Sequence, residues 1–261
     1  MTKALLVVSF GTSFADVADR TIGAVERALA ASFPERTLYN AWTSKFICAK
    51  VERETGVHHM QVEEACAAMI AAGVDDLLVQ PTFLMQSHEH ELMLENLRAA
   101  VEADDAVRVR IGDTLLASAD DCAQLAQAVI EAFSDVADDE ALVLMGHGSD
   151  TGNEVYARMQ EAFDAAGHKN IIIGTVEGVP DFDAVRAAAA DLAPKRVWLA
   201  PFMIVAGDHA NNDLAGEEPD SWKSQLEADG FACEAVLRGL GEYSQVQSLF
   251  VEHAQRALAE G

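Results

Sequence analysis

Three residues of types that bind divalent metal ions each follow an apolar segment of this sequence. His147 lies in MGHGS, His209 in AGDH and Glu177 in TVEG. Two imidazoles and one carboxylate that leave a coordination position open form an N/O site for a first-row divalent cation. Neutral imidazoles and carboxylates also accept protons. The three residues therefore predict a site for a divalent metal ion.

Each of these residues also has an ordinary structural explanation. His147 between two glycines suits a turn at the end of a strand, and Glu177 alone suits a solvated loop. Asp208 is favoured as a helix N-cap, which places His209 in the first helical turn. The positive end of a helix disfavours an imidazolium there, so the neutral form that binds metals is favoured.

The segment 88–91, HEHE, also has the composition of a metal-binding tract. Neighbouring residues of a helix point about 100° apart, so at most one or two of these side chains can face one point. A polar helix start, in which glutamates are favoured by the helix dipole, explains the segment without any ligand.

Strands and helices must alternate to position these residues. Apolar runs predict strands over 4–10, 36–42, 76–83 and 107–112. Amphipathic and Ala-rich stretches predict helices over 16–33, 61–72 and 88–102. This alternation is typical of an α/β fold with parallel strands and with helices on both faces of the sheet. Ligands of such sheets bind outside the carboxyl ends of the strands, which is where His147 is expected.

The second half of the chain repeats the first. Three segments align in order: 6–11 with 143–148, 38–43 with 172–177, and 76–81 with 196–201. The alignment pairs three positions of the first half with the three site residues: Phe10 with His147, Thr43 with Glu177, and Glu89 with His209. Ordered matches of this kind predict two duplicated α/β domains. Glu89 is then the one polar group that the first half keeps at these positions, and it suits a proton acceptor or a carboxylate that handles the metal.

The boundary between the two domains is expected in the acidic segment 134–140. This choice gives an N-terminal domain over 1–135 and a C-terminal domain over 136–261, each long enough for its own core. A final helix is expected over 244–259, and we expect that it can pack back on the first domain.

The formal net charge is -25, from 43 acidic and 18 basic residues. Such a field repels nucleic acids and anionic membranes, so neither is an expected partner. No apolar run reaches the ~20 residues that a membrane span needs, and the first run is too short for a secretory signal. The 4 cysteines are widely spaced, as in a reduced protein. We therefore expect a cytoplasmic protein.

Five motifs occur in order along the chain: SFGTS at 9–13, MGHGS at 145–149, VEG at 176–178, VAGDHANND at 205–213 and DSWK at 220–223. The ordered set resembles the anaerobic sirohydrochlorin cobaltochelatases of cobalamin biosynthesis, a class II chelatase family, in their long two-domain form. The resemblance runs from Lys3 to Glu242, nearly the whole chain. It implies two chelatase-like α/β domains with parallel sheets flanked by helices, and a tetrapyrrole cleft between them.

The resemblance also implies an activity and residues that carry it. The activity is a lyase reaction that inserts Co²⁺ into sirohydrochlorin with loss of two protons. His147 is implied as a metal ligand and proton acceptor, and Glu177 and His209 as ligands of the same ion. A functional glutamate of the family falls on Glu89, although its histidine neighbours depart from the family pattern. The implied catalytic residues are therefore His147, His209 and Glu89.

Contacts to the tetrapyrrole are expected from the glycine-containing loops and from the segment after the third strand of each domain. The expected residues are Phe10, Gly11, Thr12, Ser13, Met85, Gly148 and Met203. The apolar segments 83–85 and 202–204 suit the walls of a flat pocket, although such residues more often belong to the core.

Several alternatives stay open at this point. Fe²⁺ or Ni²⁺ insertion into the same ring is one, because affinity alone does not make N/O ligands select Co²⁺. A protoporphyrin ferrochelatase is another. A non-catalytic metal or haem carrier with two domains is a third, and the missing export signal counts against it. We expect no cofactor beyond the substrate metal, and the sequence leaves homo-oligomerisation open.

Overall fold

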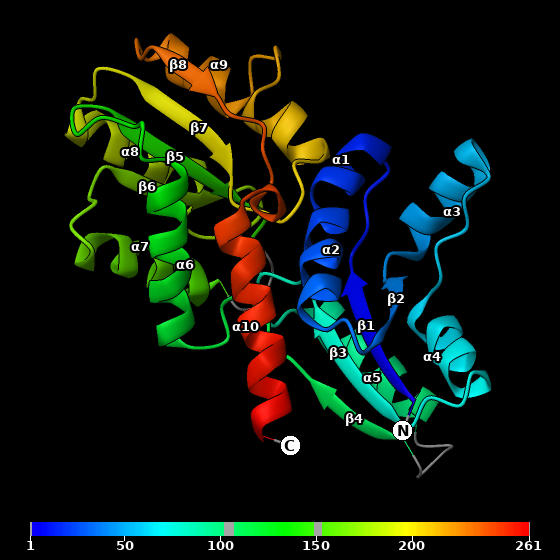
Figure 1. Ribbon diagram of the computed structural model, residues 1–261. Helices are drawn as coiled ribbons and strands as arrows, with labels where there is room; N and C mark the ends of the chain where they lie inside the picture. The colour runs from blue at the N-terminus through cyan, green and yellow to red at the C-terminus, as the bar shows by residue number, and fades with distance from the viewer. Residues whose placement is uncertain (1, 102–106, 149–152, 261) are drawn as a thin grey trace. The chain divides into compact units, whose positions relative to one another are not determined.

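The computed structural model describes residues 2–101, 107–148 and 153–260, which divide into two compact units (Figure 1). Unit 1 comprises Met1–Ala117 together with Gln247–Gly261, and unit 2 comprises Ser118–Val246. The expected boundary after residue 135 differs from this division, because it leaves helix α6 (Ala119–Ala132) in the first domain. The structure groups α6 with unit 2, and it groups most of the last helix with unit 1.

Unit 1 is built on a parallel four-stranded sheet with the order β2-β1-β3-β4. Its strands are β1 (Lys3–Ser9), β2 (Thr37–Trp42), β3 (Asp76–Pro81) and β4 (Arg108–Ile111). Its helices are α1 (Ala15–Arg20), α2 (Ile22–Ser32), α3 (Lys45–Thr55), α4 (Val62–Ala71), α5 (His88–Val101) and, from Gln247 onward, α10 (Ser244–Glu260). The central strands β1 and β3 are buried along nearly their whole length, which explains their continuous apolar sequences.

Alternate residues of β1 face two different helical layers. Ala4, Leu6 and Val8 belong to one buried cluster with residues of α4 and α5. These helical residues are Val62, Ala65, Cys66, Met69, Met93 and Leu97. Successive side chains of a strand point to opposite faces, so the intervening residues of β1 face the side of the sheet on which α2 packs.

Unit 2 has the same architecture, with the strand order β6-β5-β7-β8. Its strands are β5 (Ala141–Gly146), β6 (Ile171–Thr175), β7 (Val197–Pro201) and β8 (Cys233–Ala235). Its helices are α6, α7 (Glu154–Ala165), α8 (Phe182–Leu192), α9 (Trp222–Ala228), the π-helical turn η1 (Ala210–Leu214) and the 3₁₀ turn η2 (Leu240–Glu242). One core joins β5 and β7 to α8 and α9, while α7 contacts β6 and packs on α6.

The two sheets are duplicates down to their backbone register. Val8 pairs with Pro81 in unit 1, and Met145 pairs with Pro201 in unit 2. The N–H of Thr82 then donates to the carbonyl of Val8 at 2.8 Å, and that of Phe202 donates to Met145 at 2.7 Å. This register makes Phe10 the counterpart of His147, as the sequence alignment predicts.

The register corrects the alignment by one residue at the second strand. The N–H of Ser44 donates to the carbonyl of Phe10 at 3.2 Å, and that of Glu177 donates to His147 at 2.7 Å. Ser44 is therefore the counterpart of Glu177, and the prediction of Thr43 is wrong. A slip of one residue in an apolar strand leaves its hydrophobic pattern nearly unchanged, so the sequence could not fix the register here.

Other differences from the expected elements are local. The helix expected over 16–33 is broken at Thr21, whose hydroxyl donates to the carbonyl of Val17 at 2.6 Å and so bends the chain. Helix α3 was not expected at all. It begins after Ser44, whose side chain accepts a hydrogen bond from the N–H of Ile47 at 3.3 Å. Within the described ranges, every helix is too short or too polar to cross a membrane.

Candidate metal centre

His147 directly follows β5, and a backbone carbonyl orients its ring. The Nδ1 atom lies 2.8 Å from the carbonyl oxygen of Gly148. A carbonyl oxygen only accepts hydrogen bonds, so Nδ1 carries the proton and donates it. Nε2 of the neutral ring then presents its lone pair, and the residue is exposed. His147 is thus arranged to bind a ligand through Nε2.

His209 lies at the start of the helical segment that follows β7 and the loop 202–207. Helical backbone begins at Asp208, so this residue lies in the first turn and is not the expected N-cap. Nδ1 of His209 lies 2.6 Å from Oδ2 of Asp213, within the π-helical turn. Metal-binding histidines commonly donate their second ring N–H to a carboxylate, which fixes the tautomer. This arrangement leaves Nε2 of His209 as the free nitrogen.

Glu177 lies just after β6 and is tied to the His147 loop through the backbone. Its N–H donates to the carbonyl of His147 at 2.7 Å, and the N–H of Val176 donates to Gly146 at 3.0 Å. These two bonds continue the β5–β6 ladder beyond the strand ends. The carboxylate and the imidazole of His147 are therefore carried by neighbouring chain segments.

The three side chains converge on one point of unit 2. One ligand atom from each lies within 4.8 Å of the others, and the described residues contain one such group. The ring centroids of His147 and His209 are 4.7 Å apart, with an interplanar angle of 88°. Ligand nitrogens lie about 2.1 Å from a first-row ion such as zinc, so modest side-chain rotations bring all three onto one ion. The set is chemically suited to a divalent cation that keeps open coordination positions.

Two glycines allow the loop after β5 to approach its neighbours closely. Gly148 has φ +82°, and a Cβ there would lie 2.2 Å from the carbonyl oxygen of Glu177. A Cβ on Gly146 would lie 2.3 Å from the ring of Tyr156. The Tyr156 hydroxyl accepts a hydrogen bond from the N–H of Gly148 at 3.1 Å, and burial raises the pKa of this hydroxyl. The side chain of Tyr156 thus supports the loop that carries His147.

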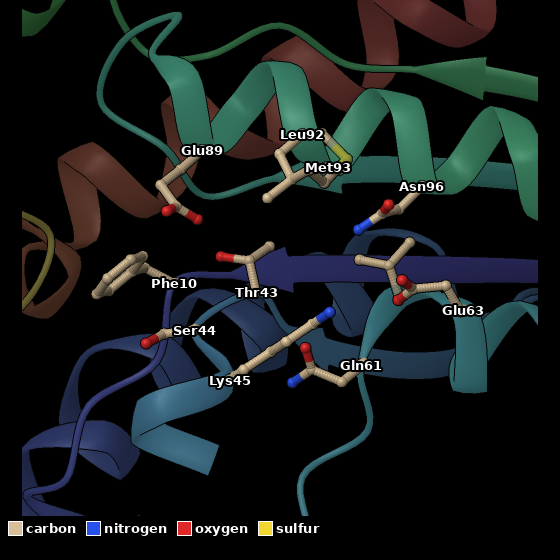
Figure 2. A pocket seen from close by; sticks show the side chains of 11 residues that line it. Phe10, Thr43, Ser44, Lys45, Gln61, Glu63, Glu89, Leu92, Met93 and Asn96 are labelled. Atoms are coloured by element: carbon tan, nitrogen blue, oxygen red, sulfur yellow. The ribbon is translucent and has the colours of Figure 1, made fainter. Parts of the chain in front are cut away.

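Glu89 lies in unit 1, in the first turn of α5. It lines a pocket of about 270 Å³ together with Phe10 and Ser44, the counterparts of His147 and Glu177 (Figure 2). Phe10, Ser44 and Glu89 therefore line one pocket in unit 1, and the three site residues of unit 2 converge on one point. The relation of Glu89 to the metal site stays a prediction.

The remaining expected contact residues fall into two groups. Phe10 is 44% exposed, and Ser13 is half-buried and accepts a hydrogen bond from Lys50 at 3.1 Å. Met85 is buried, and Met203 packs against the core of unit 2. Gly11, Thr12 and Gly148 are also buried, where they shape loops. Of the segments expected to wall a flat pocket, Phe83 belongs to the core of unit 1.

The HEHE segment separates into differently placed side chains, as helix geometry predicts. His88 is exposed, whereas His90 is buried with its ring 6.0 Å from that of Phe83. Burial lowers the pKa of His90, which favours its neutral form. Glu91 is exposed. The four residues therefore do not present a common site.

Two further residues, Asp213 and Tyr156, support the candidate metal centre without being predicted from the sequence. Asp213 follows His209 by four positions, a spacing that brings side chains together on a helix and could have identified this partner. Tyr156 lies in the first turn of α7, with no sequence feature that points to the Gly148 loop. Only the packing of α7 near the end of β5 reveals its contact.

Comparison with known proteins relates nearly the whole chain to chelatases. The family model described as cobalt chelatase (CbiK) matches residues 3–259. The chain is 36% identical over 259 residues to the sirohydrochlorin cobaltochelatase of Salmonella typhimurium, covering 99% of this chain and 97% of that protein. It is 32% identical over 186 residues to the sirohydrochlorin cobaltochelatase CbiKC of Nitratidesulfovibrio vulgaris, covering 69% of this chain and 64% of that protein.

The fold is shared with a solved structure of much lower sequence identity. SirB from Bacillus subtilis, determined with Fe³⁺, superposes with a TM-score of 0.72 at 14% identity. The superposition covers 100% of this chain and 97% of SirB. With a full-length family match, a curated relative above 30% identity and the duplicated sheets, the chain belongs to the cobalt chelatase (CbiK) family.

Proposed function

We propose that this chelatase inserts Co²⁺ into sirohydrochlorin, with release of two protons. The observation that carries the proposal is the convergence of His147, Glu177 and His209, with Nδ1 of both rings engaged by oxygen atoms. These contacts leave Nε2 of each imidazole as the nitrogen available to a metal ion. The relatives named sirohydrochlorin cobaltochelatase supply the substrate and the metal.

The proposed reaction needs a cation that is held but not enclosed. Two neutral imidazoles and one carboxylate carry a single negative charge, so a divalent ion bound by them stays an electrophile. The exposure of His147 and Glu177 leaves positions for ring nitrogens to replace water on the ion. As the metal enters the ring, two pyrrole N–H protons leave, and the metal passes from the protein ligands to the ring nitrogens.

Proton removal is the second task of these residues. A neutral imidazole accepts a proton readily near pH 7, so His147 is the proposed first acceptor. Its Nε2 becomes available for the proton when the metal moves onto the ring. Glu89 is proposed as a second acceptor that passes a proton to solvent. The Asp213 carboxylate stabilises any positive charge that develops on the ring of His209.

The identity of the metal is proposed from the relatives and not from the ligand set. N/O sites bind Ni²⁺ and Cu²⁺ more tightly than Co²⁺, so these three ligands do not select cobalt by affinity. Fe²⁺ and Ni²⁺ therefore belong in the test as competing substrates. Selection of cobalt is expected in the rate of insertion, not in the strength of metal binding.

The test follows the absorption spectrum of sirohydrochlorin after addition of purified protein and Co²⁺, Fe²⁺ or Ni²⁺. We expect the fastest insertion with Co²⁺. H147A and H209A should each lose at least ~100-fold in rate. H168A, a change in a turn of unit 2, should retain the wild-type rate. Binding of the ring or the metal without accelerated insertion would indicate a carrier instead. Full activity of both variants would exclude this metal centre.

A further inference from the structure

The pocket of unit 1 holds polar groups that the proposed reaction does not use. Figure 2 shows Lys45, Gln61, Glu63 and Asn96 around one end, and Glu89 with Phe10 at the other. The pocket is lined by the starts of α3 and α4 and by α5 from Glu89 to Asn96. Its volume of about 270 Å³ admits a small polar substituent, not a whole macrocycle.

Lys45 is the cation of this pocket. No carboxylate of the described residues forms an ion pair with Lys45, and its ammonium group points into the pocket (Figure 2). Glu63 and Glu89 line the same pocket without pairing with it. The ammonium is therefore available to an anion from outside.

Hydrogen-bonding groups accompany this charge. The hydroxyl oxygen of Thr43 is buried and has no hydrogen-bond partner among the described residues, although a buried hydroxyl normally has one. It points toward the Glu89 side of the pocket (Figure 2). The amide of Asn96 points toward Lys45 from α5. A bound group with oxygen atoms would satisfy both the ammonium and these polar side chains.

The position of the pocket in the fold also points to a ligand. Phe10 and Ser44, which line it, are the counterparts of His147 and Glu177 by strand register. Both sites thus lie at the carboxyl ends of the first two strands of their sheets, where α/β proteins bind ligands. In unit 1 the metal-binding residue types are replaced by an aromatic ring and a hydroxyl, with Lys45 next in the chain. The duplicated position in unit 1 thus presents a cationic group in a pocket that Glu63 and Glu89 also line.

We infer that this pocket binds a carboxylate side chain of the tetrapyrrole, with Lys45 as its charge partner. The inference rests on the proposed function, because the tetrapyrrole supplies the carboxylate. An acidic protein repels a substrate that carries many carboxylates unless a local cation offsets the repulsion. In this inference Lys45 supplies such a cation. Lys45 is a binding residue in this proposal and takes no part in metal insertion.

The test compares K45Q, which removes the charge but keeps a polar side chain, with K45R and with K169Q. Lys169 is exposed in a turn of unit 2, so K169Q makes the same change in net charge away from the pocket. Binding of metal-free sirohydrochlorin is measured by tryptophan fluorescence quenching, and KM and kcat are measured for Co²⁺ insertion. We expect K45Q to raise Kd and KM about tenfold, the loss of one charge-assisted hydrogen bond, with kcat unchanged. K45R should stay near the wild type, and K169Q should match it.

Ionic strength gives a second readout. Added salt should raise KM of the wild type more than that of K45Q, because the variant lacks the screened attraction. Unchanged Kd and KM in K45Q, with a wild type that binds and metallates sirohydrochlorin, would overturn the inference and leave the proposed function intact. A wild type that does not bind the ring would instead overturn the proposed function.

One further experimental outcome would show that the pocket binds a cation and not an anion. Glu63 and Glu89 together offer two carboxylates to the same pocket. The variant H147A/H209A lacks the imidazoles of the metal centre, so Co²⁺ titration of this protein with and without E63Q isolates the pocket. Co²⁺ binding that is retained in H147A/H209A and lost with E63Q would show a cation site and contradict the proposal. We expect no such binding.

Discussion

Nδ1 of His209 lies 2.6 Å from Oδ2 of Asp213, four residues further along the same helical segment. The contact lies in the π-helical turn η1, a conformation often found at functional sites. It fixes the orientation of the ring and leaves Nε2 as the nitrogen that would bind a metal, with a carboxylate that strengthens it as a donor. We therefore propose that Asp213 acts on a bound metal through His209.

Replacement of Asp213 by alanine should weaken Co²⁺ binding about 10- to 100-fold, because the imidazole loses both its orientation and its charge partner. Isothermal titration calorimetry of the metal alone measures this effect without the tetrapyrrole. D213N should fall between the wild type and D213A, since its amide oxygen still accepts the Nδ1–H. D191A, on an exposed face of α8, makes the same charge change and should bind as the wild type. Equal affinity of D213A and wild type would contradict the role of Asp213.

Replacement of Gly148 by alanine should damage the metal centre through the backbone. The new Cβ would collide with the carbonyl oxygen of Glu177 in a residue held at φ +82°. G167A is a matched control, because Gly167 has φ +91° but no atom within 4 Å of the new Cβ. Both variants should lose about 1–2 kcal/mol of unfolding free energy from the positive φ. Only G148A should also lose Co²⁺ affinity, as measured by calorimetry, and equal affinity of the two variants would show that the collision is relieved elsewhere.

The buried carboxylate of Asp76 should make unfolding depend on pH. Burial alone raises its pKa, but hydrogen bonds from Arg110 and Arg36 outweigh burial and hold the pKa below its usual value. A lowered pKa in the folded state stabilises the protein above the unfolded pKa of ~3.9, and this contribution is lost as the pH falls through the folded value.

D76N should therefore lose about 3 kcal/mol of unfolding free energy at pH ~7, because two guanidinium groups lose a buried anion. The deficit should shrink as the pH is lowered below ~4, where the wild type also loses the charge. Urea unfolding at both pH values measures the difference. D229N removes an exposed partner of Arg186 and should change the stability little. A deficit that is the same at both pH values would show that shape, not charge, is what Asp76 contributes.

Glu89 should matter for the rate of insertion and not for metal affinity. E89Q keeps the size of the side chain but cannot accept a proton, so kcat for Co²⁺ insertion should fall about 100-fold. The Co²⁺ affinity measured without the ring should stay at the wild-type value, because the three converging residues are all intact. E91Q is the control on the same helix, since Glu91 is exposed and lies outside the pocket. Unchanged kcat in E89Q would remove Glu89 from the proton path.

The sequence by itself determined the repeated α/β architecture and the three converging residues. Short continuous apolar runs such as 141–144, alternating with longer helical stretches, are typical of strands buried on both faces, and parallel sheets place the residues after such strands at one edge. His147, Glu177 and His209 follow three strands of one sheet, so their meeting depends on topology more than on detailed packing. The motifs that contain these three residues also carry the resemblance to the chelatase family.

Tertiary structure decided what depends on register and on packing at close range. Ser44 replaced Thr43 as the counterpart of Glu177 because backbone hydrogen bonds, not apolar patterns, fix the register of a strand. The hydrogen bonds of His147 and His209 through Nδ1, and the unpaired ammonium of Lys45, likewise depend on ångström-scale positions. Hydrophobic burial selects the fold from the pattern of the sequence, whereas hydrogen bonds and charges depend on distances that only the folded chain defines.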